Sequence, residues 1–358
     1  MAKFAEVFSD ETKRGYKIPT SEYLTSGKHP IIDQGYGQIA GYADLESGAF
    51  TDVPAIIFGD HTRIVKYVDT PFFLGADGVK VLKIKTPNAD YKYLFYFLQN
   101  AKIPNTGYNR HFKWLKELDV PLPSIDEQRR IAAILDKVTD LIDKRRAQMD
   151  KLDLLVKSRF VEMFGENEKT TTMARYISEL QGGKSLAGTA PCKNKVLKTG
   201  AATFGWFDPE QYKYLPVDYE PLPEHKVKTG DVIISRMNTP ELVGACAYVF
   251  DAPENMYYPD RLWRAVLKEK TNPIFLWQLL WERDIRKAIK ENSGGTSGTM
   301  HNISKANLLA IKCVDVPIEL QNQFAIFVEQ IQKSKLILQQ SFNKLEALKK
   351  SLMQQYFG

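Results

Sequence analysis

Apolar residues recur in alternating steps of four and three along residues 128–165 and again along 321–358. This mean spacing of about 3.5 residues is typical of a helix that packs against another helix along a narrow seam. The pattern predicts long helices at residues 124–165 and 318–358. Their seam, which we also expect to dock protein partners, comprises Ile131, Leu135, Val138, Ile142, Leu152, Phe324, Val328, Ile331, Leu338 and Leu345.

The two helical stretches are copies of one another. QRRIAAILDKVTDLIDKRRAQMDKLDLLVKSRFVEMFG, which starts at residue 128, aligns without a gap with QNQFAIFVEQIQKSKLILQQSFNKLEALKKSLMQQYFG, which starts at residue 321. Ser124 and Glu127 stand in a capping-box relation at the first helix. Because the copies share register and each is too long to pack within one small domain, antiparallel pairing of the two helices is expected.

The segments before the helices also match in outline. VPAIIFGD, FFLGADGVKVLKIK and DYKYLFYFLQN in the first correspond to KTGDVIISR, YYPDRLWRAVLKEK and NPIFLWQLLWERDIRKAI in the second. Short β-branched and aromatic runs separated by Gly and Pro predict strands, with few helices between them. The fold class is therefore α+β: two mostly β domains at residues 1–123 and 166–317, each followed by a long helix, and the two helices form an antiparallel coiled coil.

Composition narrows the class of protein. A charge of +6 permits nucleic-acid binding without demanding it, because the excess is spread along the chain. Three scattered cysteines argue against a disulfide framework and a cysteine-rich zinc site. No apolar run is long enough to span a membrane, and the first residues lack the apolar centre of a signal peptide. We expect a cytoplasmic protein without a membrane partner.

At the junction PLPSIDEQRRIAAIL, residues 121–135, the sequence resembles the specificity subunits of type I restriction–modification systems. The resemblance extends over essentially the whole chain, although the second junction has Leu320 where the first has Glu127. It implies two target-recognition domains that each bind one half of a bipartite site in double-stranded DNA. It also implies that the helices set the spacer between the halves and dock methyltransferase subunits, which bind S-adenosylmethionine; motor or endonuclease subunits are further partners in that family.

Candidate catalytic residues are few. Asn272-Pro273-Ile274-Phe275 is similar to the Asn-Pro-Pro-Tyr/Phe turn of adenine methyltransferases, but Ile274 stands where that turn has proline, and Asn-Pro also begins many helices. The glycines of DQGYGQIAGY at residues 33–42 precede no helix that would hold a phosphate. The five histidines form no metal-binding pair. We expect no catalytic residue, no metal site and no cofactor in this chain.

DNA recognition by such domains depends on polar and basic side chains in loops, because arginine pairs with guanine and Asn or Gln with adenine. The candidates in the first domain are Gln34, Tyr36, His61, Thr62, Arg63, Asn109, Arg110, His111 and Lys113. Those in the second domain are Lys184, Ser185, Arg236, Asn238, Thr239, Arg261, Thr296, Ser297, His301 and Asn302. Any one of them can instead serve a turn, and we expect about half to contact DNA.

Two other functions remain compatible with the sequence. One is a stand-alone DNA-modifying enzyme, a methyltransferase or a nuclease, with an unrecognised site. The other is a coiled-coil adaptor that binds only protein. Methyl-transfer and duplex-binding assays on the purified chain distinguish all three.

Overall fold

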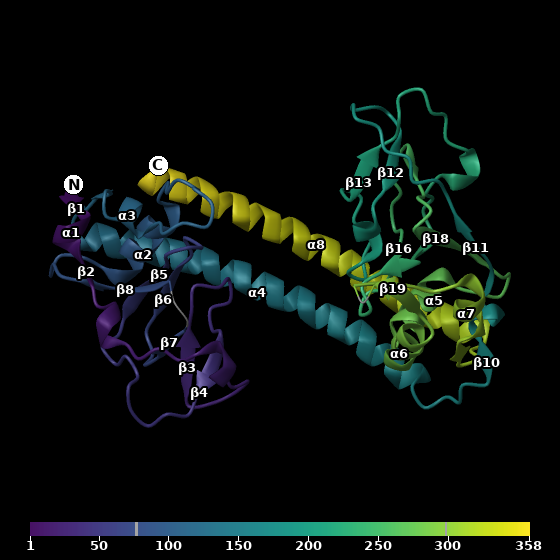
Figure 1. The fold of residues 1–358 in the computed structure, drawn as a ribbon, viewed down its shortest axis with the longest axis horizontal. Helices are drawn as coiled ribbons and strands as arrows, with labels where there is room; N and C mark the ends of the chain where they lie inside the picture. The colour runs from purple at the N-terminus through teal and green to yellow at the C-terminus, as the bar shows by residue number, and fades with distance from the viewer. Residues whose placement is uncertain (76–77, 298) are drawn as a thin grey trace. The chain divides into compact units, whose positions relative to one another are not determined.

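A computed structural model describes residues 1–75, 78–297 and 299–358, without the side chains of Thr296 and Ser297. The chain divides into two compact units. Unit 1 combines Met1–Ala147 with Leu338–Gly358, and unit 2 is Gln148–Ile337. Each unit therefore contains one globular domain and a part of each long helix (Figure 1).

The two long helices are α4 (Ile125–Phe164) and α8 (Ile318–Phe357), each of 40 residues. No position of the four-and-three pattern is exposed in either helix. At the start of α4 the Ser124 hydroxyl accepts a hydrogen bond from the Glu127 amide, at 3.3 Å. The Glu127 carboxylate pairs with Arg130 instead of turning back to Ser124, so only one half of the predicted capping box forms.

Contacts within each unit show that the helices run antiparallel. In unit 1, Arg145 donates to the Ser341 hydroxyl at 3.2 Å, and Met353 packs in the cluster that contains Ile131. In unit 2, Lys335 pairs with Asp153 at 2.6 Å, and the Phe160 ring lies 5.4 Å from that of Phe324. In both units, residue numbers rise along one helix as they fall along the other.

The predicted seam has two parts. Ile131 and Leu135 pack in the core of the first domain, and Phe324 and Val328 in that of the second, so these residues bind a helix to its own domain. Val138 and Ile142 follow on α4 and are buried as well. The remaining seam residues are only partly buried, as a pair of helices with solvent on both sides requires. They are Leu152, Ile331, Leu338 and Leu345.

The domain of unit 1 contains two principal sheets. One sheet is antiparallel, in the order β2-β8-β5-β6. In the other, β4-β3-β7, β3 pairs antiparallel with β4 and parallel with β7. The bounds are β1 (Ala2–Lys3), β2 (Phe8–Asp10), β3 (His29–Ile32), β4 (Gly41–Ala43), β5 (Ala55–Gly59), β6 (Val65–Val68), β7 (Phe73–Leu74), β8 (Val79–Ile84) and β9 (Asp119–Val120), with helices α1 (Phe4–Val7), α2 (Tyr91–Asn100) and α3 (Phe112–Leu115).

The domain of unit 2 repeats both sheets, in the orders β11-β18-β14-β16 and β13-β12-β17, again with one parallel pair. A further sheet, β15-β20-β19, is added. The bounds are β10 (Thr171–Thr172), β11 (Ile177–Gly182), β12 (Lys195–Leu197), β13 (Tyr212–Tyr214), β14 (Val232–Ser235), β15 (Met237–Asn238), β16 (Cys246–Tyr248), β17 (Met256–Tyr257), β18 (Leu262–Leu267), β19 (Gly294–Ser297), β20 (Met300–Asn302) and β21 (Lys312–Cys313), with helices α5 (Pro273–Trp281), α6 (Arg283–Glu291) and α7 (Lys305–Ala310).

A buried glutamine performs the same task in each unit. Gln128 accepts a hydrogen bond from the Asp90 amide at 2.9 Å and donates to the carbonyls of Asn88 and Pro123. Gln321, its repeat equivalent, accepts from the Asn272 amide at 2.9 Å and donates to two carbonyls in the same way. Both glutamines are fully buried. Each thus fixes a long helix to the start of the short helix, α2 or α5, of its own domain.

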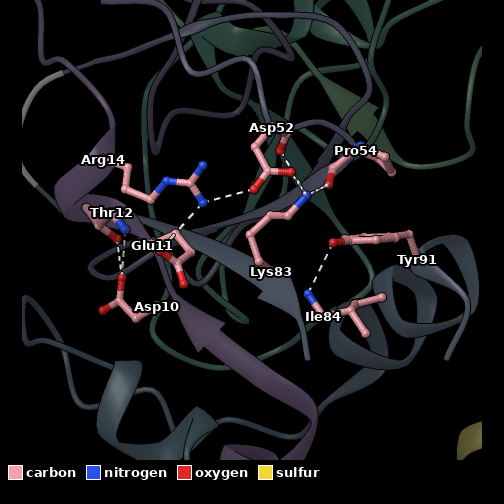
Figure 2. A network of polar contacts seen from close by, with 9 residues as sticks. All are labelled: Asp10, Glu11, Thr12, Arg14, Asp52, Pro54, Lys83, Ile84 and Tyr91. Atoms are coloured by element: carbon pink, nitrogen blue, oxygen red, sulfur yellow. Dashed lines mark hydrogen bonds and ion pairs between the residues drawn. The ribbon is translucent and has the colours of Figure 1, made fainter. Parts of the chain in front are cut away.

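A polar network joins the N-terminal segment of unit 1 to β8 (Figure 2). Lys83 on β8 donates to the carbonyls of Asp52 and Pro54 at 2.9 and 2.8 Å, and Arg14 pairs with the Asp52 carboxylate at 2.9 Å. The hydrogen bonds from Lys83 and Arg14 lower the pKa of Asp52 below its usual value. Arg14 and Lys83 are thus paired with Asp52 inside the domain, and their role is to hold the loop at residues 52–54 in place.

Candidate nucleic-acid interface

Three connections of the first domain meet at His61: residues 33–40 between β3 and β4, 60–64 between β5 and β6, and 101–111 after α2. The Gln34 side chain accepts a hydrogen bond from the His61 amide at 3.1 Å, and the Thr62 hydroxyl donates to the Gln34 carbonyl at 2.7 Å. The His61 ring stacks on that of Tyr108, with centroids 4.6 Å apart. The structure therefore brings Gln34, His61 and Thr62 together.

A buried lysine holds one of these loops. Lys66 on β6 is 3% exposed, and its ammonium donates to the Gly37 carbonyl at 2.6 Å and to the Asp33 carboxylate at 3.3 Å. Burial lowers the pKa of Lys66 below its ordinary value, and the carboxylate of Asp33 partly offsets that effect. Because a buried charge is costly without partners, these contacts fix both ends of the 33–37 turn.

The other predicted residues of the first domain differ in accessibility. Arg63 has a positive φ of 62° and donates to the Ile103 carbonyl at 3.2 Å, which joins two of the loops. His111 is fully buried, and its ring contacts the Asp60 carbonyl at 2.9 Å, so it supports the loop from within and the DNA contact predicted for it is wrong. The exposed members are Tyr36, Asn109, Arg110 and Lys113.

In the second domain, part of the predicted set gathers on the additional sheet. Arg236 donates through Nε to the Asn302 side chain at 3.1 Å, and its guanidinium lies 5.9 Å from the Trp263 ring. Asn238 is the strand partner of His301 on β20. Thr239 follows directly and is exposed. This arrangement holds one arginine and several amide or imidazole groups on two neighbouring strands of this sheet and beside them, which suits contacts with base edges.

The remaining predicted residues of this domain lie elsewhere or outside the described part. Ser185 hydrogen-bonds with Asp260, and Lys184 and Arg261 beside them are exposed. Ser185 and Arg261 line a polar cleft of about 680 Å³. The side chains of Thr296 and Ser297, on β19, lie outside the described residues.

Sequence reasoning missed several residues of these surfaces. In the first domain they are Lys66 and Tyr108, whose partners are distant in sequence. In the second domain they are Lys198 and Lys213, which line the polar cleft from the end of β12 and from β13. Lys198 begins the connection between β12 and β13, which corresponds to residues 33–40 of the first domain, and Lys213 lies on β13 just after that connection. An alignment of the two domains by strand order would have indicated that region.

The structure gives Asn272 a structural role. Its side chain accepts hydrogen bonds from the amides of Ile274 and Phe275 at 3.0 and 3.4 Å, so it caps helix α5. Asp90 caps α2 in the same manner in the first domain. The similarity to a methyltransferase turn is thus explained by helix capping. Among the described residues, no group of three or more His, Cys, Asp or Glu side chains is placed to hold a metal ion.

Comparison with known proteins agrees with the fold and with the resemblance stated from the sequence. The sequence profile of the type I restriction modification DNA specificity domain matches residues 2–152. The chain is 26% identical, over 316 residues, to the type I restriction enzyme MjaVIII specificity subunit of Methanocaldococcus jannaschii, covering 78% of this chain and 74% of that one. The chain is thus similar, over most of its length, to the specificity subunits of type I restriction–modification systems.

Two further similar proteins share less sequence with this chain. The chain is 24% identical to the EcoKI specificity subunit of Escherichia coli K12, over 60% of this chain and half the length of that protein. The type I restriction–modification S subunit from M. genitalium has the same fold, with a TM-score of 0.60 at 16% identity, over 98% of this chain and 94% of that one. No helix among the described residues is both long and apolar enough to cross a membrane.

Proposed function

We propose that this chain is the DNA-recognition subunit of a type I restriction–modification complex, in which each domain binds one half of a bipartite site. The observation that supports this proposal most directly is the internal repeat of a domain followed by a long helix. The two domains have the same order of strands in both principal sheets, and part of their candidate polar residues, those within residues 61–63 and 236–239, follow corresponding strands, β5 and β14. A protein with two similar recognition domains is suited to two short DNA sequences separated by a spacer.

The long helices supply the second part of the function. They present partly buried apolar residues such as Leu338 beyond the domain cores, and further apolar side chains, including Leu154 and Ile337, are exposed. Exposed apolar side chains on paired helices favour docking of helices from another protein. We infer that methyltransferase subunits bind there, and that the helices determine the spacer length.

Catalysis belongs to the partner subunits in this proposal. The methyltransferase subunit binds S-adenosylmethionine and transfers the methyl group, and this chain contributes neither a donor site nor a nucleophile. The test is a methyl-transfer assay on the chain alone. Turnover in preparations free of other subunits, retained in Asn272→Ala, would contradict the proposal.

Selection of bound duplexes from a random pool tests DNA recognition. The assembled complex is expected to enrich two conserved half-sites at a fixed spacing. Arg63→Ala should relax base preference in one half only, and Arg236→Ala in the other, because one base-specific arginine contact contributes about 1–3 kcal/mol. Equal relaxation of both halves by one substitution would refute the model of two separate recognition domains.

A further inference from the structure

The same strand connection carries exposed aromatic side chains in both domains. Residues 33–40 join β3 to β4, and residues 198–211 join β12 to β13; we call them the aromatic loops. Tyr36 in the first is 95% exposed, and Phe204 and Trp206 in the second are 64% and 60% exposed. Large aromatic side chains are usually buried, so their exposure at equivalent places requires an explanation.

Both aromatic loops are held in a defined conformation. Lys66 fixes the first through Asp33 and the Gly37 carbonyl. In the second, the Thr203 hydroxyl donates to the Thr199 carbonyl at 2.9 Å, and the Phe204 and Trp206 rings pack together with their planes 28° apart and their centroids 5.7 Å apart. A ring on a fixed loop loses little conformational entropy when a ligand binds, which favours a contact role.

Each aromatic loop also adjoins the polar residues proposed to recognise bases. In the first domain, Gln34 bonds with His61 and Thr62 of the β5–β6 connection. In the second, Asn238, which follows β14, lies 3.5 Å from the hydroxyl of Thr203. Each aromatic loop therefore contacts candidate base-contacting groups in its own copy of the domain.

We propose that Tyr36 in one domain, and Phe204 with Trp206 in the other, stack on nucleobases and unstack a base step within each half-site. This inference rests on the proposed DNA-recognition function. Stacking needs a single accessible ring face, whereas a protein interface needs a patch of several hundred Å² on each partner. Tyr36, almost fully exposed on a loop of mostly polar residues, fits the first requirement. Such unstacking selects flexible base steps through the cost of deforming DNA.

Phe204 and Trp206 also border a cleft of about 690 Å³, lined further by Tyr248, Trp277 and Trp281. A side chain from a partner protein could enter this cleft, which is the main alternative for the second aromatic loop. The repeat favours DNA, because the corresponding loop of the first domain bears an exposed tyrosine as well. The experiment therefore measures DNA binding and subunit assembly separately.

The test uses the assembled complex and duplexes that carry 2-aminopurine, one position at a time, across the selected site. The wild-type complex should raise the fluorescence at one step in each half-site. Tyr36→Ala should abolish the rise in one half only and weaken binding about tenfold to a hundredfold, whereas Tyr36→Phe should preserve both. Trp206→Ala should do the same in the other half, with Trp206→Phe as its control.

Each outcome has one interpretation. Fluorescence and affinity unchanged in both alanine variants, with wild-type selection of the site intact, would overturn the stacking proposal and leave DNA recognition standing. Loss of methyltransferase assembly by Trp206→Ala, seen by size-exclusion chromatography, would assign the second aromatic loop to a protein partner and overturn the proposal for it. A wild-type complex that selects no bipartite site would refute the proposed function itself.

Discussion

Replacement of Gln128 by alanine should destabilise the junction between helix α4 and the first domain without affecting the second. The side chain makes hydrogen bonds of 2.9, 3.0 and 2.9 Å with the Asp90 amide and with the Asn88 and Pro123 carbonyls. At about 0.5–1.5 kcal/mol each, with an added cost for polar groups left buried, their loss amounts to about 2–4 kcal/mol.

Hydrogen–deuterium exchange detects this loss locally. If α2 opens at this junction, the substitution lowers the free energy of opening by about 2–4 kcal/mol. Amide exchange in peptides covering residues 88–98 is then about thirtyfold to eight-hundredfold faster. Peptides covering residues 270–280, in the second domain, should exchange as in the wild type. Gln321→Ala should give the reverse pattern, because its bonds lead to the second domain.

Gln323→Ala is a suitable control, since Gln323 is exposed on α8 two residues after Gln321. It should leave exchange in both regions unchanged. Equal acceleration in both regions by Gln128→Ala would show that the units do not open independently. No acceleration in either would show that the buried glutamine does not hold the junction.

Three further predictions concern the helices and the thiols. Leu135→Asp places a charge at a fully buried position and should lower the free energy of unfolding by several kcal/mol in urea denaturation, whereas Leu141→Asp, at a 40% exposed position, should not. Burial raises the pKa of the Cys246 thiol, so at pH 8 a thiol reagent should modify half-buried Cys192 well before Cys246 in the folded protein; equal rates would contradict the described burial. Four residues inserted into the exposed middle of α4 lengthen it by about 6 Å and should increase the selected spacer by about one or two base pairs; an unchanged spacer would mean that the helices do not set it.

The long helices could be predicted in detail because their periodicity directly reports burial. Every position of the four-and-three pattern is at least partly buried, and the predicted limits differ from the observed ones by at most one residue at either end. The pattern did not indicate which seam residues pack on a domain. Ile131 and Phe324 occupy equivalent steps of the repeat, and both prove to belong to domain cores, which depends on tertiary contacts beyond the helix.

Loop residues could be predicted only as a group. His111 has the residue type and setting expected of a DNA contact, yet it is fully buried against Asp60, a partner 51 residues away. The sequence does not single out Lys66, because a lysine in a strand is usually exposed and only the fold brings it to Asp33. Residue type indicates what chemistry a loop can perform, but accessibility is decided by contacts remote in sequence.

The composition of unit 1 has a consequence for synthesis in the cell. The core of unit 1 includes Met353, and the Phe357 ring lies 5.3 Å from that of Tyr93. This core is therefore completed by residues that are synthesised long after Met1–Ala147. At roughly 5–20 residues per second, translation of the intervening residues 148–337 takes about 10–40 s. During that interval the apolar surface around Tyr93 in the first domain is uncovered. All residues of unit 2 are synthesised in the same interval, because unit 2 is continuous in sequence. The domain that is translated first is therefore the one that is completed last.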